Sequence, residues 1–258
     1  MKSQYRMLFA FVVLLLLVSL ACKFVVPGNA TQAPATEPPV TAPPVQTQEP
    51  ATTVATEAPS AQSSAEQFFT EEFDGGIDNW SRLNVTGSKD TNVDGLKLET
   101  ANSHLVFDFS TKELYAYLFY QPYNYGDVAV EASVENRGTN DNQISLVCRY
   151  SDEGWYEFNV ANSGLYNILY GSKNASGVIG YARLADGGSK KIKSGKDVNT
   201  YKIICKGHRL SLYINGIETK SLDDNQYVLR DGKVGISVSS FKNLPVKVEY
   251  DWVKISQP

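Results

Sequence analysis

The chain is poor in the residues on which most catalytic and metal sites depend. Its 258 residues include three cysteines and two histidines. Neither His104 nor His208 lies near a recognisable nucleophile signature, so a catalytic cysteine would lack its base. The sequence also has no glycine-rich nucleotide loop, no zinc-type Cys/His spacing and no Ser/His/Asp signature. These absences argue against nucleotide binding, zinc binding and triad-type hydrolysis.

Positive charge is scarce as well. The chain has 24 Lys and Arg against 28 Asp and Glu, a formal net charge of −4. No basic patch dominates, so the sequence offers no electrostatic basis for a nucleic-acid partner. One local cluster is interpreted as a solvated loop and consists of Lys190, Lys191, Lys193 and Lys196.

Sustained helical periodicity is the third absence. Instead, about a dozen short segments alternate apolar and polar residues at spacings of roughly 8–12 residues, which is typical of an antiparallel sandwich. The best marked is residues 143–160, QISLVCRYSDEGWYEFNV, where two alternating runs flank an acidic turn that contains a glycine. This pattern predicts a β-hairpin. Asn215 and Gly216 predict a second tight hairpin.

The amino terminus has the organisation of an export signal. Lys2 and Arg6 precede an apolar run, residues 7–21, that ends at Cys22. The run is shorter than the about 20 residues of a spanning helix, and its order fits a signal peptide over residues 1–22. The sequence SLAC resembles a bacterial lipoprotein signal, which implies a lipidated Cys22 and a place on the extracytoplasmic face of the cell membrane. An uncleaved anchor and ordinary cleavage after Ala21 remain alternatives. A single lipid chain would hold only marginally.

Residues 23–67 form a low-complexity linker of Pro, Thr, Ala, Glu and Gln. Such a composition cannot bury enough apolar surface to offset chain entropy, so we expect it to be disordered. Its prolines make it extended and semi-stiff, which suits a tether. Residues 68–258 are long enough for one sizeable core and are assigned to a single all-β domain.

Two cysteines of the globular part are expected to face its core. Cys148 shares a strand face with Ile144 and Leu146, and Cys205 shares one with Tyr201 and Ile203. In an exported chain, Cys148 and Cys205 are expected to form a disulfide. The alternative is two separate buried thiols that act as small hydrophobic side chains.

Three parts of the sequence resemble a known superfamily. They are EEFDGGIDNW near the start, LVCRYSDEGWYEFNV with YKIICKGHRLSLYINGIE in the middle, and DGKVGISVSS with VKVEYDWVKI at the end. Together they resemble the concanavalin A-like lectin/glucanase superfamily, in particular jelly-roll domains of bacterial surface lipoproteins. The resemblance covers about 190 residues and implies two curved antiparallel sheets, with a sugar site on the concave face.

The resemblance extends to glucanases, whose catalytic motif is missing here. Those enzymes carry carboxylates in the order Glu-x-Asp-x-x-Glu, because a retaining pair must flank one glycosidic bond at about 5 Å. Asp152, Glu153 and Glu157 are the nearest approach, and the first two are expected in a turn. No catalytic residue is therefore assigned, and the chain is interpreted as a binding protein in preference to an enzyme. Jelly rolls that act on 3-keto-disaccharides are a further resemblance without a matching motif.

The same resemblance implies a structural calcium ion. In those glucanases an Asp of the last strand helps to bind it, and Asp251 in YDWVKI matches that position. Calcium needs six or more oxygen ligands, many of them backbone carbonyls, of which the sequence shows one. The alternative is that Asp251 hydrogen-bonds a neighbouring loop. No other cofactor is expected.

Aromatic rings and polar side chains suggest where a sugar would bind. Residues 114–127, LYAYLFYQPYNYGD, are the richest in tyrosine, and their second half is expected to be a loop. Arg149 is expected to face outward, because it alternates with Cys148. The predicted ligand-binding residues are Arg149, Trp155, Tyr156, Tyr120, Tyr123 and Tyr125.

Three functions from different classes fit these patterns. The preferred one is a membrane-tethered, non-catalytic module that binds carbohydrate or a cell-surface glycan. The alternatives are a glycoside-active enzyme of the glucanase type and an envelope domain with a structural or protein-interaction role.

Overall fold

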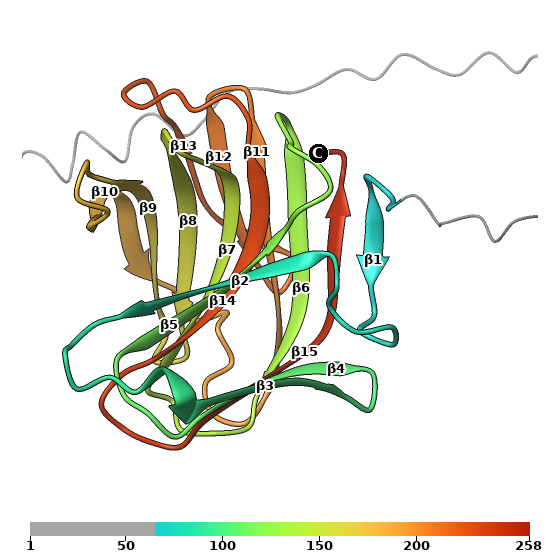
Figure 1. The fold of residues 1–258 in the computed structure, drawn as a ribbon. Coiled ribbons are helices and arrows are strands. Elements are labelled where there is room, and N and C mark those ends of the chain that lie inside the picture. The colour runs from blue at the N-terminus through green and yellow to red at the C-terminus, as the bar shows by residue number, and fades with distance from the viewer. Residues whose placement is uncertain (1–64) are drawn as a thin grey trace, which may run out of the picture. The chain divides into compact units, whose positions relative to one another are not determined.

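The computed structural model describes residues 65–258, which form an all-β sandwich of two antiparallel sheets (Figure 1). This confirms the predicted fold class. The predicted signal peptide, Cys22 and the linker up to residue 64 lie outside the described residues. Within the described part, no helix is long and apolar enough to cross a membrane.

One sheet, here called the back sheet, has eight strands. Its order is β13-β12-β11-β6-β15-β4-β3, and β1 pairs with β15. A short 3-10 turn, Val93–Gly95, precedes β3. The strands are β1 (Phe69–Glu71), β3 (Leu96–Ala101), β4 (His104–Phe109), β6 (Val128–Asn136), β11 (Val198–Lys206), β12 (Arg209–Ile214), β13 (Ile217–Asp223) and β15 (Val246–Ser256).

The other sheet, here called the groove sheet, has seven strands in the order β10-β9-β8-β7-β14-β5-β2. Its central pair is the predicted hairpin, and the observed strands extend it by a residue at each end. The strands are β2 (Trp80–Thr86), β5 (Leu114–Tyr120), β7 (Asn142–Ser151), β8 (Gly154–Ala161), β9 (Leu165–Lys173), β10 (Ile179–Gly188) and β14 (Lys233–Ser240).

The core lies between the two sheets and is built by strand alternation. Successive side chains of a strand point to opposite faces, so every second residue turns inward. On β7 these are Ile144, Leu146 and Cys148, and on β14 they are Val234, Ile236 and Val238, all of them buried. The back sheet contributes its own inward rows to the same cluster.

A disulfide joins the two sheets through this core. Cys148 of β7 bonds Cys205 of β11, and both side chains are fully buried. The pairing confirms the prediction made from the inward alternation of both strands. Since β7 and β11 belong to different sheets, the bond ties one layer to the other.

Three tyrosines hold the chain where the described residues begin. The hydroxyls of Tyr123, Tyr120 and Tyr125 donate to the carbonyl oxygens of residues 65, 66 and 67, at 2.7, 2.9 and 2.7 Å. The rings of Phe68 and Phe69 pack against Tyr125 and Tyr120, with centroids 6.0 and 4.8 Å apart. The entry segment is thus fixed by side chains before strand β1 pairs with β15.

Replacing both Cys148 and Cys205 by serine is expected to lower the free energy of unfolding by about 4 kcal/mol. The reason is that the bond closes a long loop, with a sequence separation of 57. Denaturant unfolding of the full chain measures the change. The matched control is Cys22→Ser, and a double variant as stable as this control would contradict the expectation.

Candidate functional site

The outward face of the groove sheet carries an unusual row of small polar side chains. Strand register places Tyr117, Ser237, Ser145, Asn159 and Asn167 side by side on five neighbouring strands. These side chains point away from the core, yet Ser237, Ser145 and Asn159 are buried. Something must cover these outward residues, either larger neighbouring side chains or another part of the sheet.

The groove sheet does curl over this face. Strands β10 and β5 are five positions apart in the sheet, which is about 24 Å if the sheet were flat. The hydroxyls of Tyr181 on β10 and Tyr117 on β5 nevertheless lie 3.0 Å apart. The two edges of the sheet therefore approach each other and leave a groove between them.

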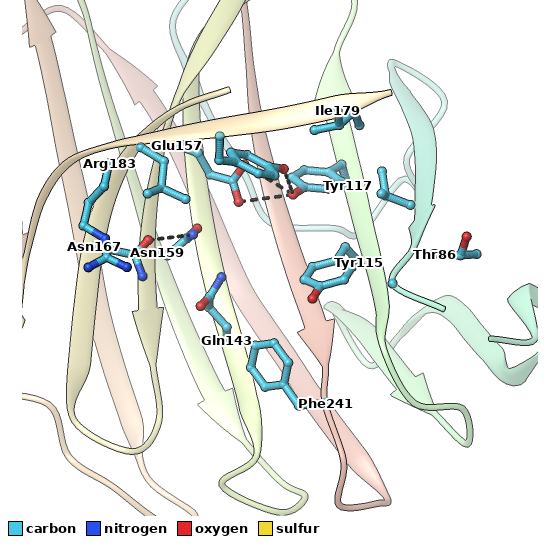
Figure 2. Close-up of a pocket in the computed structure, with 14 residues that line it drawn as sticks. Thr86, Tyr115, Tyr117, Gln143, Glu157, Asn159, Asn167, Ile179, Arg183 and Phe241 are labelled. Atoms are coloured by element: carbon cyan, nitrogen blue, oxygen red, sulfur yellow. Dashed lines mark hydrogen bonds between the residues drawn. The ribbon is translucent and has the colours of Figure 1, made fainter. Parts of the chain in front are cut away.

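The groove has a volume of about 470 Å³, within the range of small-ligand pockets. In Figure 2, Tyr115 and Tyr117 face Asn159, Asn167 and Arg183 across it, and Phe241 lies toward its lower end. The lining comes from strands at both edges and from the centre of the sheet. It consists of Val85, Thr86, Gly87, Tyr115, Tyr117, Gln143, Glu157, Asn159, Asn167, Leu169, Ile179, Tyr181, Arg183 and Phe241.

Several polar atoms of this face have no protein partner. Among the described residues, the hydroxyls of Ser237 and Ser239 and the side-chain oxygen of Asn159 are buried without a hydrogen bond. The amide nitrogen of Asn159 donates to Asn167 at 2.9 Å. Buried polar groups are nearly always hydrogen-bonded in folded proteins. Asn159 lines the groove, so its side-chain oxygen is the free hydrogen-bond acceptor of the lining, while Ser237 and Ser239 lie opposite Tyr117 and Tyr115 on the neighbouring strand.

Glu157 is the one carboxylate in the groove lining. Its oxygens accept hydrogen bonds from Tyr117 at 3.1 and 3.3 Å and from the indole nitrogen of Trp155 at 3.0 Å. Burial raises the pKa of the Glu157 carboxyl above its usual value, and the hydrogen bonds from Trp155 and Tyr117 oppose that rise. Burial, together with the Glu157 charge, also raises the pKa of the phenols of Tyr117 and Tyr181.

The groove lacks the pair of carboxylates that glycosidic cleavage uses. Counted from Glu157, the order Glu-x-Asp-x-x-Glu meets Asn159 and Asn162, two amides. Asp152 and Glu153 fall in the turn between β7 and β8, as predicted, and they line a different hollow. A single carboxylate, already bonded by two side chains, cannot act as both nucleophile and acid.

Arg149 does not face outward, so that prediction is wrong. The pairing of β7 with β8 shifts register between Cys148 and Ser151, and Arg149 takes a positive φ of 56° there. This bulge turns the side chain inward, where it is 2% exposed. Its guanidinium donates to the carbonyl oxygens of Gly126, Gly207 and Leu229 at 3.2, 2.8 and 2.7 Å, so it ties three loops together.

Tyr156 is also placed inside, contrary to the prediction that it belongs to a ligand surface. It alternates with Trp155 and Glu157 and so points between the sheets, where it is 1% exposed. Its hydroxyl donates to Asp224 and accepts from the backbone of Leu229 at 3.0 Å.

The structure does not bring Tyr120, Tyr123 and Tyr125 to the groove. Their hydroxyls are occupied by residues 65–67. Trp155 does lie on the outward face, but neighbouring rings cover it and it is 3% exposed. The predicted ligand-binding roles of these four residues stay predictions.

Asp251 is exposed on β15, where its carboxylate lies 3.7 Å from Nε2 of His104. Calcium takes oxygen ligands, so His104 does not suit it. In residues 65–258, no three His, Cys, Asp or Glu side chains gather in a way that could hold a metal. The side chain near Asp251 does not suit calcium, and the calcium site stays a prediction.

No family model matches the sequence, and no curated protein sequence matches it. Solved structures do share the fold. A GH16 protein of the Bacteroides ovatus mixed linkage glucan PUL, in complex with a G4G4G3G product, superposes with a TM-score of 0.55 at 11% identity and covers 73% of this chain and 99% of its own. A Bacillus subtilis protein of unknown function with a galectin-like fold gives a TM-score of 0.55 at 12% identity and covers 73% and 94%.

A β-1,3-glucanase from Mycobacterium marinum gives a TM-score of 0.52 at 13% identity and covers 76% of this chain and 100% of its own. The described residues thus have the concanavalin A-like jelly-roll fold, as the sequence resemblance implied. At these identities the likeness concerns the fold alone. The likeness gives no role to any residue that lines the groove.

The groove uses residues that the sequence interpretation did not select. Tyr115 and Tyr117 alternate with Ala116 and Leu118, a pattern that would have placed both tyrosines on one face had β5 been recognised as a strand. Ser237 and Ser239 alternate with Ile236 and Val238 in the same way. Tyr181 gave no usable signal, because β10 is rich in glycine and alanine and was not predicted.

The raised pKa of Glu157 makes a prediction about stability and pH. A carboxyl with a raised pKa in the folded state stabilises the fold most below its usual pKa of 4.5, and that contribution is lost as the pH rises through the folded value. Glu157→Gln removes the titration and leaves the wild type relatively less stable as the pH rises. Denaturant unfolding of both proteins between pH 4.5 and about pH 8 measures this. A stability difference that is constant or grows in favour of the wild type would contradict it.

Proposed function

We propose that the groove binds a neutral carbohydrate and does not cleave it. The observation that carries this proposal is the unpartnered buried amide oxygen of Asn159 in the groove lining, beside the rings of Tyr115 and Tyr117. The unpartnered hydroxyls of Ser237 and Ser239 lie opposite these two tyrosines on β14. Sugars present hydroxyl groups around their edge and apolar C–H groups on their faces. Polar groups at the floor and aromatic rings at the wall match these two surfaces.

The charge of the groove supports a neutral ligand. Glu157 is bonded to Tyr117 and Trp155, and the one cationic side chain of the lining, Arg183, is exposed and lies 3.8 Å from Asp186. The structural neighbours include a protein described as a β-1,3-glucanase and a GH16 protein of a mixed linkage glucan PUL, which supports a carbohydrate over other neutral ligands.

A glycoside-active enzyme is the second candidate, and Glu157 is the observation that favours it. A buried carboxyl with a raised pKa resembles a general acid. Non-catalytic binding is preferred because no second carboxylate lines the groove. Turnover of a β-glucan that disappears in Glu157→Gln, with the binding of the same glucan retained, would establish the enzyme instead.

We further propose that the domain is displayed outside the membrane. The apolar run before Cys22 and the proline-rich residues 23–67 support a lipid anchor followed by a spacer.

Tyr115→Ala is expected to weaken glycan binding about two- to tenfold, since one aromatic contact contributes about 0.5–1.5 kcal/mol. Titration calorimetry of the full chain against linear β-1,3-linked and mixed-linkage gluco-oligosaccharides measures the change. Tyr213→Ala is the matched control, because Tyr213 lies on the back sheet and bonds Glu218. No binding across neutral oligosaccharides of diverse linkage would refute the proposal.

Cys22→Ser is expected to abolish incorporation of labelled palmitate and to release the chain from the membrane fraction in a bacterial host. The physical reason is that a serine hydroxyl cannot form the thioether of a lipoprotein. Labelling that persists in the variant would point to a different anchor. Cys148→Ser should leave the labelling unchanged.

A further inference from the structure

The outward face of the groove sheet is divided into two separate hollows. The groove described above is one. The second has a volume of about 570 Å³ and is lined by residues such as Leu83, Phe119, Tyr150 and Lys233. The two hollows share no lining residue. Side chains must therefore lie between the two hollows and separate them.

The barrier is a continuous set of aromatic rings, here called the dam. Its members are Tyr117, Phe119, Tyr150, Trp155 and Tyr181. Going round the set, ring centroids lie 5.9 Å apart from Tyr117 to Phe119, 3.9 Å from Phe119 to Tyr150, 5.4 Å from Tyr150 to Trp155 and 5.9 Å from Trp155 to Tyr181. The hydroxyls of Tyr181 and Tyr117, 3.0 Å apart, complete the circuit.

Strand β10 supplies the upper part of the dam. In Figure 2, the strand that carries Ile179 and Arg183 runs across the top of the groove toward Tyr117. Ile179, Leu83 and Val85 pack against the same cluster of buried residues, although β10 and β2 are opposite edges of the sheet. The dam therefore spans the groove from edge to edge.

Two glycines make room for these rings in the sheet. A Cβ at Gly171 would lie 2.3 Å from the indole of Trp155, and a Cβ at Gly235 would lie 2.6 Å from the ring of Phe119. Glu157 joins two members of the dam, because Tyr117 and Trp155 both donate hydrogen bonds to its carboxylate. Tyr117, Phe119 and Trp155 are each 3% exposed, as in a packed core.

We propose that the groove is a blind pocket that accepts the end of a glycan chain and excludes the interior of one. This inference rests on the proposed carbohydrate binding and specifies its ligand class. A sugar chain that continued past both sides of the groove would need to cross the dam, which means displacing packed rings. A chain that ends in the groove meets the free oxygen of Asn159 and stops against Tyr117 and Tyr181.

The first test compares linear and cyclic glucans of one linkage on the full wild-type chain. Cyclic β-1,3-glucan has no chain end, so we expect it to bind at least about tenfold more weakly than linear β-1,3-gluco-oligosaccharides. The affinity of the linear series, from disaccharide to heptasaccharide, should stop rising by the tetrasaccharide, because only a few residues fit before the dam. Titration calorimetry measures both.

The second test removes side chains of β10 from the aromatic barrier between the two hollows. Ile179→Ser combined with Tyr181→Ala removes its upper part from a strand at the edge of the sheet, where Tyr181 is 45% exposed. This variant should gain about fivefold or more in affinity for cyclic glucan and for the heptasaccharide relative to the trisaccharide. Val178→Ser is the matched control, since Val178 is 62% exposed in the loop that enters β10 and lines neither hollow.

The outcomes separate this inference from the proposed function. Equal binding of cyclic and linear glucan by the wild type would overturn the blind pocket and leave carbohydrate binding standing. Failure of every oligosaccharide to bind would overturn both. If the double variant does not fold, as judged by circular dichroism, the comparison of linear and cyclic glucan on the wild type still decides.

Discussion

The curl of the groove sheet is the constraint on which the rest of the site depends. A flat sheet would leave Ser237, Ser239 and Asn159 in open water, where their polar atoms would need no explanation. The curl is held by contacts between distant strands, chiefly the meeting of Tyr117 with Glu157 and Tyr181. The contact of Tyr117 with Glu157 is buried, so breaking it leaves unpaired polar groups, whereas the contact with Tyr181 is partly buried.

Glu157 has a structural role in the wall of the groove. Its carboxylate is fixed by an indole and a phenol, and its environment disfavours ionisation. A nucleophile in a glycosidase must instead be ionised and free to approach a sugar carbon, with an acid close by. In this groove the acidic group organises aromatic walls, and an amide stands at Asn159. A fold shared with solved glucanases therefore occurs here with a single carboxylate in the groove lining.

The sequence predicted the fold through its inward-facing rows. Ile144, Leu146 and Cys148 alternate without interruption, so the central hairpin followed from spacing, and the disulfide followed from the inward position of both cysteines in a chain expected to be exported. The prediction was wrong at Arg149, because a one-residue bulge reverses the face of every later side chain and leaves no local signature. Tyr156 was misassigned for a related reason, since its aromatic character was given more weight than its place in the inward row.

The groove itself was largely beyond sequence reasoning. Its two edge strands, β2 and β10, were not predicted: β10 contains several glycines and little alternation, and β2 follows a turn-rich stretch. The contacts that close the groove join residues such as Tyr117 and Tyr181, which are 64 positions apart in the chain. Contacts of that kind depend on how strongly a sheet curls, and a single sequence carries no periodic signal for curl.

The three phenols that grip residues 65–67 have a mechanical consequence. Strand β1 is three residues long and pairs with β15 near the carboxyl end of the chain, as with Phe69 opposite Ile255. Any tension that reaches the domain through its amino-terminal side acts first on the hydroxyl grips of Tyr123, Tyr120 and Tyr125, and only afterwards on the short ladder. The pull is thereby divided among three hydrogen bonds, and one of them, from Tyr120, passes it to the end of β5 in the groove sheet before β1 is loaded.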